Sequence, residues 1–198
     1  MRHTNFLIVH GTLGNPESNW FPWLKRELEK EGQTVIVPRF PTPEGQTLSS
    51  WLDVAEKVVK GLDPADTVLI GHSLGAIFLL RLAEKAQKPF QAAFLVCPFM
   101  RKIGVEPYDT LNATFIQPPL DWPRIRKNAP RIHAFAGQDD PYVPLPYASE
   151  VAEQSGATLT VIDKGGHLNA ESGYREFPLL LEKIRQTILP HVANYALS

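Results

Sequence analysis

One pentapeptide in this chain has the composition of a turn that presents a nucleophilic serine. Residues 71–75 are Gly-His-Ser-Leu-Gly, a G-x-S-x-G motif with Ser73 at its centre. A short β-branched run at 67–70 precedes the motif and helix-forming residues follow it, so we expect Ser73 at a sharp turn from strand to helix. Such a turn strains the serine backbone and exposes its hydroxyl. The alternative is a glycine-rich turn without chemistry.

A serine hydroxyl is a poor nucleophile unless a base takes its proton and an acid orients the base. The acid candidates are Asp139 and Asp140, which follow the apolar run 132–136. We favour Asp140, because the proline after it confines its backbone to extended conformations and holds the carboxylate still. An ordinary Asp-Pro turn is the alternative for this pair.

The base candidate is His167, which follows the apolar run 158–162 and two consecutive glycines. The glycines let the loop bend sharply, so that His167 can turn back over the edge of a sheet. Other histidines are weaker candidates. We expect His10 to be structural, and we expect the turn to point His72 away from Ser73.

Backbone amides are expected to bind the negative oxygen that forms when serine attacks a carbonyl group. One donor is the N–H of Leu74, reinforced by the positive end of the following helix. The second is expected from Thr12, with Leu13 as the fallback, in a loop where Gly11 permits close backbone approach. Substrate contacts are expected from Gly11, Trp20 and Tyr142, although packing is the commoner role of such aromatic side chains.

Strands and helices alternate around these residues. Apolar runs predict six strands, at 5–9, 34–38, 67–70, 92–97, 132–136 and 158–162. Helical patterns lie at about 20–31, 48–61, 75–87, 146–155 and 176–193. This alternation predicts right-handed crossovers and an α/β fold whose parallel sheet is covered by helices on both faces.

Two segments, 38–47 and 98–130, break the alternation. The longer one has only a weak helix signal, near 122–128. Segment 98–130 is either a short lid or substrate wall, or a surface excursion whose aromatic side chains dock on the core.

Composition limits the classes of function. The 198 residues are expected to form one domain, and the 43% hydrophobic and 21% charged residues are ordinary for a soluble globular protein. A net charge of −1 predicts no general attraction to nucleic acid or anionic membrane. We interpret the basic cluster at 124–131 as a solvated face.

The single cysteine, Cys97, cannot form an intrachain disulfide, and no Cys/His group has the spacing of zinc ligands. The apolar stretch 6–9 is too short for a signal peptide, and no run approaches transmembrane length. We therefore expect a cytoplasmic protein.

Taken together, these motifs resemble an α/β-hydrolase over essentially the whole chain. The likeness is to the small, nearly capless retinoblastoma-binding (YdeN-like) serine hydrolase family. It is carried by His10-Gly11, 20–24, 71–75, 139–144 and Gly165-Gly166-His167. The resemblance implies a triad of Ser73, Asp140 and His167. It also implies a three-layer sandwich with six parallel strands in the order 2-1-3-4-5-6 and a minimal cap.

The expected activity is hydrolysis of small or medium acyl esters through an acyl-enzyme, without metal or organic cofactor. The expected ligand is a small-molecule acyl substrate, and the sequence leaves any protein partner unknown. Thioesterase or peptidase action would use the same triad. A binding protein on a hydrolase scaffold is the rival from another class. The complete set of Ser73, Asp140 and His167 argues against it, and a serine in place of aspartate disfavours a dehalogenase.

Overall fold

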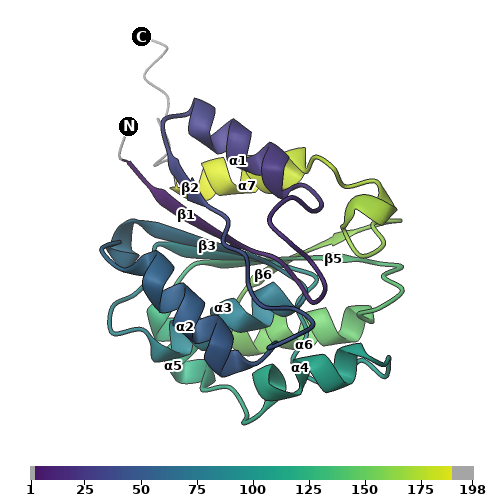
Figure 1. Ribbon diagram of the computed structural model, residues 1–198. Helices are drawn as coiled ribbons and strands as arrows, with labels where there is room; N and C mark the ends of the chain where they lie inside the picture. Colours follow the sequence, from purple (N-terminus) through teal and green to yellow (C-terminus); the bar gives the residue numbers. More distant parts are fainter. Residues whose placement is uncertain (1–2, 189–198) are drawn as a thin grey trace.

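The computed structural model describes residues 3–188 and contains one parallel sheet (Figure 1). Its strands are β1 (Asn5–Val9), β2 (Thr34–Ile36), β3 (Thr67–His72), β4 (Ala92–Val96), β5 (Ile132–Gly137) and β6 (Thr158–Ile162). They lie in the order β2-β1-β3-β4-β5-β6, and every neighbouring pair is parallel. The predicted fold class and strand order are confirmed.

Helices cover both faces of this sheet (Figure 1). Helices α1 (Phe21–Lys30) and α7 (Pro178–Ile188) lie on one face. On the other lie α2 (Leu48–Val59), α3 (Leu74–Lys85), α4 (Tyr108–Ile116), α5 (Trp122–Asn128) and α6 (Leu145–Ser155). Two single turns of 3-10 helix occur at Pro64–Asp66 and Ala170–Ser172. Residues 189–193 of the predicted last helix lie outside the described residues.

The core consists of two apolar layers, one on each side of the sheet. Along β1, Phe6 and Ile8 join the layer under α1 and α7, whereas Leu7 and Val9 join the layer under the other helices. Because both faces are covered, the central strands are apolar at nearly every position and do not alternate with polar residues. This is why the strands could be found as continuous apolar runs.

Segment 98–130 contains a helix that the sequence analysis missed. Helix α4 includes β-branched and polar residues that form helices only modestly well, so its local signal was weak. The segment is fastened to α3 by Arg81, whose buried guanidinium donates hydrogen bonds to the carbonyl groups of Phe115 and Pro118. Phe115 and Ile125 are part of the core. The segment therefore docks on α3 and the core, which was one of the two alternatives.

No helix among residues 3–188 combines the length and the apolar character needed to cross a lipid bilayer.

The backbone is crowded at the turn between β3 and α3. A Cβ atom on Gly71 would lie 2.6 Å from the carbonyl carbon of Gly75, and one on Gly75 would lie 2.6 Å from the His10 carbonyl oxygen. Real Cβ contacts are essentially never that short. Both glycines are therefore required for strand β1, strand β3 and helix α3 to approach one another.

We expect Gly75→Ala to lower the free energy of unfolding by about 3 kcal/mol, because the new methyl group meets rigid backbone. The control is Gly32→Ala, at an exposed left-handed position with open space, where only the backbone conformation costs about 1 kcal/mol. Urea unfolding followed by circular dichroism measures both. Equal losses in the two variants would contradict the crowding argument.

Candidate active site

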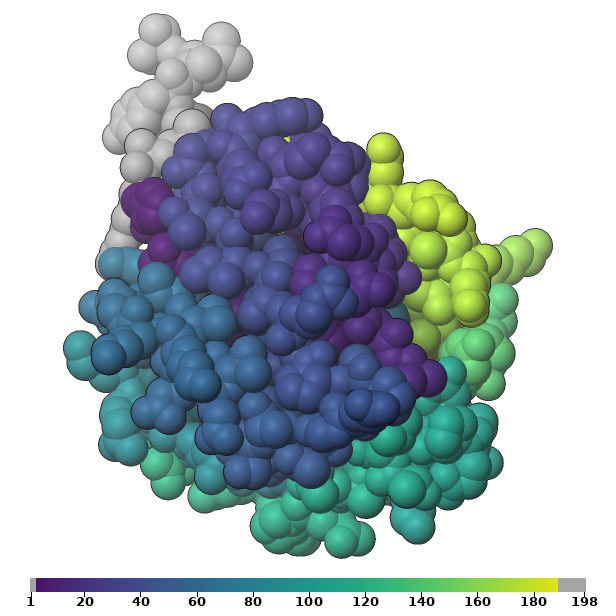
Figure 2. All heavy atoms as spheres, in the orientation of Figure 1, coloured from purple at the N-terminus to yellow at the C-terminus, as the bar shows by residue number. Residues whose placement is uncertain are grey.

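A cavity of about 230 Å³ opens at the carboxyl ends of the strands. Loops after β1, β3, β4, β5 and β6 all contribute to its lining, so residues far apart in the chain meet there. Figure 2 shows part of this meeting, where purple residues of the β1–α1 loop lie beside teal and yellow-green segments. The carboxyl edge is where ligands bind in open α/β sheets.

Ser73 lies in this lining, at the turn from β3 into α3. Its backbone angles are φ 57° and ψ −120°, a strained conformation for a residue other than glycine. The backbone N–H of Ser73 donates to the Val96 carbonyl at 2.8 Å, which ties the turn to β4. The strain expected of a nucleophile turn is therefore present, and the serine side chain faces the cavity.

Asp140 and His167 are hydrogen-bonded to each other, with His167 Nδ1 2.8 Å from Asp140 Oδ2. The other carboxylate oxygen of Asp140 accepts the backbone N–H groups of Tyr142 and Val143, each at 2.9 Å. Burial by itself would raise the pKa of Asp140, but the hydrogen bonds from His167 and the two amides outweigh it and lower that pKa. Asp140 is therefore held as a carboxylate facing the imidazole.

Asp139, the other acid candidate, has a different position. Its Oδ1 accepts the backbone N–H of Gly166 at 2.8 Å, and so it holds the loop that carries His167. The two neighbouring aspartates thus contact different parts of the same loop. The geometry agrees with the preference for Asp140 as the partner of the imidazole.

The Ser73 hydroxyl makes no hydrogen bond to His167 within residues 3–188, although both side chains line the same cavity. Hydrogen bonds of this kind are often long in ligand-free sites and tighten when substrate binds. The His167 ring is held on its other sides by Tyr142 at 5.1 Å and His72 at 4.8 Å between ring centroids. The base candidate is therefore packed, with its side chain only 9% exposed.

The loop after β1 packs directly against Ser73. A Cβ atom on Gly11 would lie 3.0 Å from Ser73 Cβ, so a glycine is needed there. The Thr12 hydroxyl donates to Asn112 Oδ1 at 2.5 Å, and the N–H of Leu13 is already bonded to Thr42 Oγ1 at 2.8 Å. Among the described residues, no acceptor pairs with the Thr12 N–H, so of the two candidate donors in this loop only the Leu13 amide is already hydrogen-bonded.

Trp20 requires a correction. It was expected to contact substrate, but its side chain is fully buried and lies outside the cavity lining. The ring packs edge-on against Phe21 and Phe177, and its indole N–H donates to the Leu168 carbonyl at 3.0 Å. Trp20 holds the loop that carries His167. Gly11 and Tyr142 do line the cavity.

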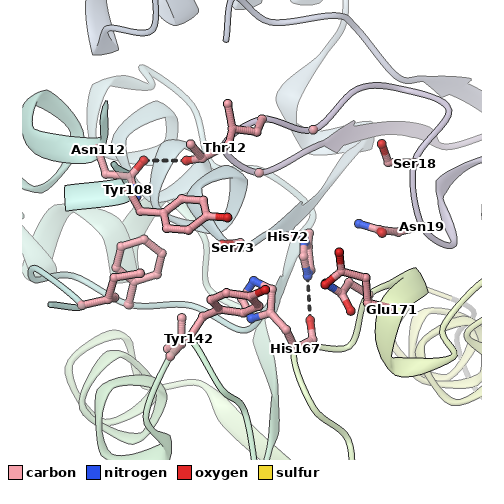
Figure 3. A pocket seen from close by; sticks show the side chains of 17 residues that line it. Thr12, Ser18, Asn19, His72, Ser73, Tyr108, Asn112, Tyr142, His167 and Glu171 are labelled. Atoms are coloured by element: carbon pink, nitrogen blue, oxygen red, sulfur yellow. Dashed lines mark hydrogen bonds between the residues drawn. The ribbon is translucent and has the colours of Figure 1, made fainter. Parts of the chain in front are cut away.

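Several lining residues were not predicted. In Figure 3, Tyr108 and Asn112 lie on one side of the cavity, and Ser18, Asn19 and Glu171 on the other. Phe99 and Ile103 add apolar surface. Segment 98–130 thus also forms a wall of the cavity, as the other alternative proposed. No local motif marks most of these residues, although nearness in sequence to His167 could have indicated Glu171.

His72 is the last residue of β3 and is 4% exposed. Its Nε2 lies 2.9 Å from the carbonyl oxygen of His167, a contact drawn in Figure 3. Burial lowers the pKa of His72 from 6.5 to about 3, so its imidazole is neutral near neutral pH. His10 is structural, as expected: its Nε2 accepts the N–H of Phe40 at 3.0 Å.

The described residues include one group of metal-ligating side chains, formed by His72, Cys97 and His167, whose ligand atoms lie within 4.8 Å of one another. His72 Nε2 is bonded to the His167 carbonyl and His167 Nδ1 to Asp140. The Cys97 thiol contacts Asp140, and burial raises its pKa well above 9.0, which disfavours the thiolate that a metal needs. We interpret these residues as part of the polar network around Asp140.

A strained serine turn, an Asp–His pair and a parallel sheet in this strand order define an α/β-hydrolase. The chain belongs to the serine hydrolase family, whose model matches residues 6–186, and it is therefore a hydrolytic enzyme. YdeN of Bacillus subtilis is 29% identical over 177 residues, which are 88% of this chain and 91% of YdeN. The rat serine hydrolase RBBP9 is 29% identical over 190 residues, 94% of this chain and 97% of RBBP9.

Solved structures agree with the fold. The crystal structure of the Bacillus subtilis ydeN gene product has a TM-score of 0.85 at 26% identity and covers 93% of this chain and 98% of its own. Est1E of Butyrivibrio proteoclasticus, solved with ferulic acid, has a TM-score of 0.74 at 15% identity, over 96% of this chain and 90% of its own. At that identity the likeness concerns the fold alone.

Buried His72 makes stability depend on pH. Its folded pKa of about 3 lies below its ordinary 6.5, so below pH 6.5 the unfolded chain takes up a proton that the folded protein refuses. This contribution to stability is complete above pH 6.5 and declines by up to about 1.4 kcal/mol per pH unit as the pH falls toward 3. Between pH 7 and 4.5, we expect the free energy of unfolding of His72→Gln to fall by about 2 kcal/mol less than that of the wild type. Urea unfolding at several pH values tests this, and parallel curves would refute it.

Proposed function

We propose that this enzyme hydrolyses small or medium acyl esters with a catalytic triad of Ser73, His167 and Asp140. The observation that carries the proposal is the 2.8 Å hydrogen bond between His167 and a buried Asp140, in a cavity that also holds the strained Ser73. A buried carboxylate that accepts a hydrogen bond from an imidazole fixes which ring nitrogen carries the proton. Here it leaves Nε2 of His167 as the acceptor for the Ser73 proton.

The reaction follows from these positions. His167 Nε2 takes the hydroxyl proton as Ser73 Oγ attacks the ester carbonyl, and Asp140 stabilises the imidazolium that forms. The tetrahedral intermediate collapses, the leaving alcohol receives the proton from His167, and an acyl-enzyme remains. Water then gives a proton to His167 and attacks the acyl group, and the acid leaves as Ser73 Oγ regains its proton.

The N–H groups of Leu74 and Thr12 are the donors that we assign to the oxyanion. The first N–H groups of a helix have no partner inside the helix, so the Leu74 amide is available at the start of α3. Gly11 packs against Ser73, and Thr12, the next residue, lines the same cavity. Two amides aimed at the developing charge contribute several kcal/mol to transition-state stabilisation, on the order of 3 kcal/mol for each donor.

The size and lining of the cavity favour a substrate with a small acyl group. Phe99, Ile103, Tyr108 and Tyr142 form an apolar wall beside Ser73. The volume of about 230 Å³ is below the usual size of drug-binding pockets, roughly 300–1,000 Å³. Short acyl chains therefore fit better than long ones.

Labelling with a fluorophosphonate probe tests the triad. We expect wild-type protein to be labelled and Ser73→Ala not to be, because the probe bonds to the nucleophile. His167→Ala and Asp140→Asn are expected to label at least about 10³-fold more slowly. Asp139→Asn is the matched control, since it changes the neighbouring carboxylate without touching the imidazole.

Loss of labelling in Asp139→Asn with retention in Asp140→Asn would move the acid by one position. A folded wild-type protein that takes no label and cleaves no activated ester would overturn the proposed function. A non-catalytic binding role would then be the better interpretation.

Chain length tests the substrate class. On p-nitrophenyl esters, kcat/KM is expected to be at least about 10-fold higher for acetate and butyrate than for dodecanoate, because a cavity of about 230 Å³ has little room for a long acyl chain. Tyr108→Ala should narrow this ratio by enlarging the site, whereas Tyr147→Phe, outside the lining, should leave it unchanged. A preference of wild type for dodecanoate would show that the cavity does not hold the acyl chain.

A further inference from the structure

The loop that carries His167 has a backbone that needs support. Gly166 and Leu168, on either side of His167, both have left-handed φ angles, 52° and 48°. For leucine this conformation costs about 1–2 kcal/mol. The loop must therefore be held by contacts with other parts of the protein, and its neighbours supply several.

Four hydrogen bonds from other elements reach consecutive parts of this loop. Asp139 accepts the N–H of Gly166 at 2.8 Å, and Asn19 accepts the N–H of Ala170 at 3.0 Å. Trp20 donates to the Leu168 carbonyl at 3.0 Å, and His72 meets the His167 carbonyl at 2.9 Å. Of these, the bond from His72 reaches the backbone of the proposed base itself.

We propose that His72 is a positioning residue, which holds His167 by its backbone carbonyl and so sets the imidazole relative to Ser73. This inference rests on the proposed triad. The motif residue before the nucleophile, to which the sequence analysis assigned no function, thereby joins the nucleophile turn to the base loop across 95 positions of sequence.

The chemistry of the contact determines which form of His72 is present. A carbonyl oxygen only accepts hydrogen bonds, so the Nε2 of His72 carries the proton and donates it. The ring is buried against Trp20 and Phe21, with centroid distances of 6.4 and 6.2 Å, and against the His167 ring. A positive charge on His72 would oppose the imidazolium that His167 must become. Burial favours the neutral form, which both donates and avoids this repulsion.

The hydrogen bond from His72 differs from the other three because it links Ser73 to His167 most directly. His72 is covalently next to Ser73, and its partner is the His167 residue, so no further residue intervenes. The Trp20 bond is of similar length but ends on Leu168, one position beyond the base. A displacement of about 1 Å in a catalytic group can lower the rate about 10²-fold. Losing the His72 bond should therefore affect the chemical step more than losing the Trp20 bond.

The test compares three variants on p-nitrophenyl butyrate. His72→Met keeps an apolar side chain of similar reach but removes the donor, and we expect kcat to fall about 30-fold or more with KM changed less than about 3-fold. His72→Gln restores an N–H donor and should recover kcat to within about 5-fold of wild type. Trp20→Phe removes the neighbouring bond and should leave kcat within about 3-fold.

A spectroscopic measurement separates positioning from a loss of stability. In protein labelled with ¹⁵N-histidine, the Nδ1 proton of His167 reports its hydrogen bond to Asp140. The proposal requires that this signal shifts or is lost in His72→Met and returns in His72→Gln. Thermal unfolding curves must show that both variants are fully folded at the assay temperature. If His72→Met does not fold, His72→Gln and His72→Asn, which differ in reach, take its place, and equal kcat in the two would overturn the proposal.

The outcomes are distinct from failure of the proposed function. Wild-type protein with neither esterase activity nor probe labelling would refute the proposed triad itself. Active wild type with an unaffected His72→Met variant, or with the same loss of kcat in His72→Met and Trp20→Phe, would refute the specific role of His72. The latter result would mean that general support of the loop is all that these bonds provide.

Discussion

The close backbone approach at the turn after β3 is the constraint on which the site depends. Strands β1 and β3 and helix α3 meet there with no room for side chains at Gly71 or Gly75. This crowding forces Ser73 into a strained conformation and leaves its hydroxyl at the carboxyl edge of the sheet. The same crowding places the loop after β1 against Ser73, where Gly11 leaves space for the approach. Once these three backbones meet, the positions of Ser73 and of the Leu74 and Thr12 amides are determined together.

Around this turn, buried polar groups fasten loops that local sequence could not order. Arg81 holds the carbonyl groups of segment 98–130, and Gln46 donates to Asn112 Oδ1 at 3.0 Å next to Thr12. The buried indole N–H of Trp20 holds the loop that carries His167 by donating to the Leu168 carbonyl. Buried polar atoms are costly unless they are paired, so each such bond favours one arrangement over looser alternatives. The cavity is accordingly walled by irregular segments that nevertheless have defined positions.

Asp140 and His72 are both buried beside His167, but the first is charged and the second is neutral. Asp140 is buried yet remains a carboxylate, because three hydrogen bonds from N–H groups stabilise its negative charge. For His72, burial outweighs the favourable charge of Asp140 and lowers the pKa to about 3, so the imidazole remains neutral. His167 contacts both groups, Asp140 through Nδ1 and His72 through its backbone carbonyl, so it lies between a charged side chain and a neutral one.

The sequence by itself determined the six strands, most helices, the nucleophile turn, and the order in which Ser73, Asp140 and His167 follow their strands. These features have local signals: apolar runs, glycines required by crowding, and a proline after Asp140. Helix α4, the burial of Trp20 and the contact of His72 with the His167 carbonyl have none, because each depends on segments distant in the chain. Local propensity in Tyr108–Ile116 was weak, and packing against α3 supplied what it lacked. Whether an aromatic residue faces substrate or core is likewise decided only when the loops close over the sheet.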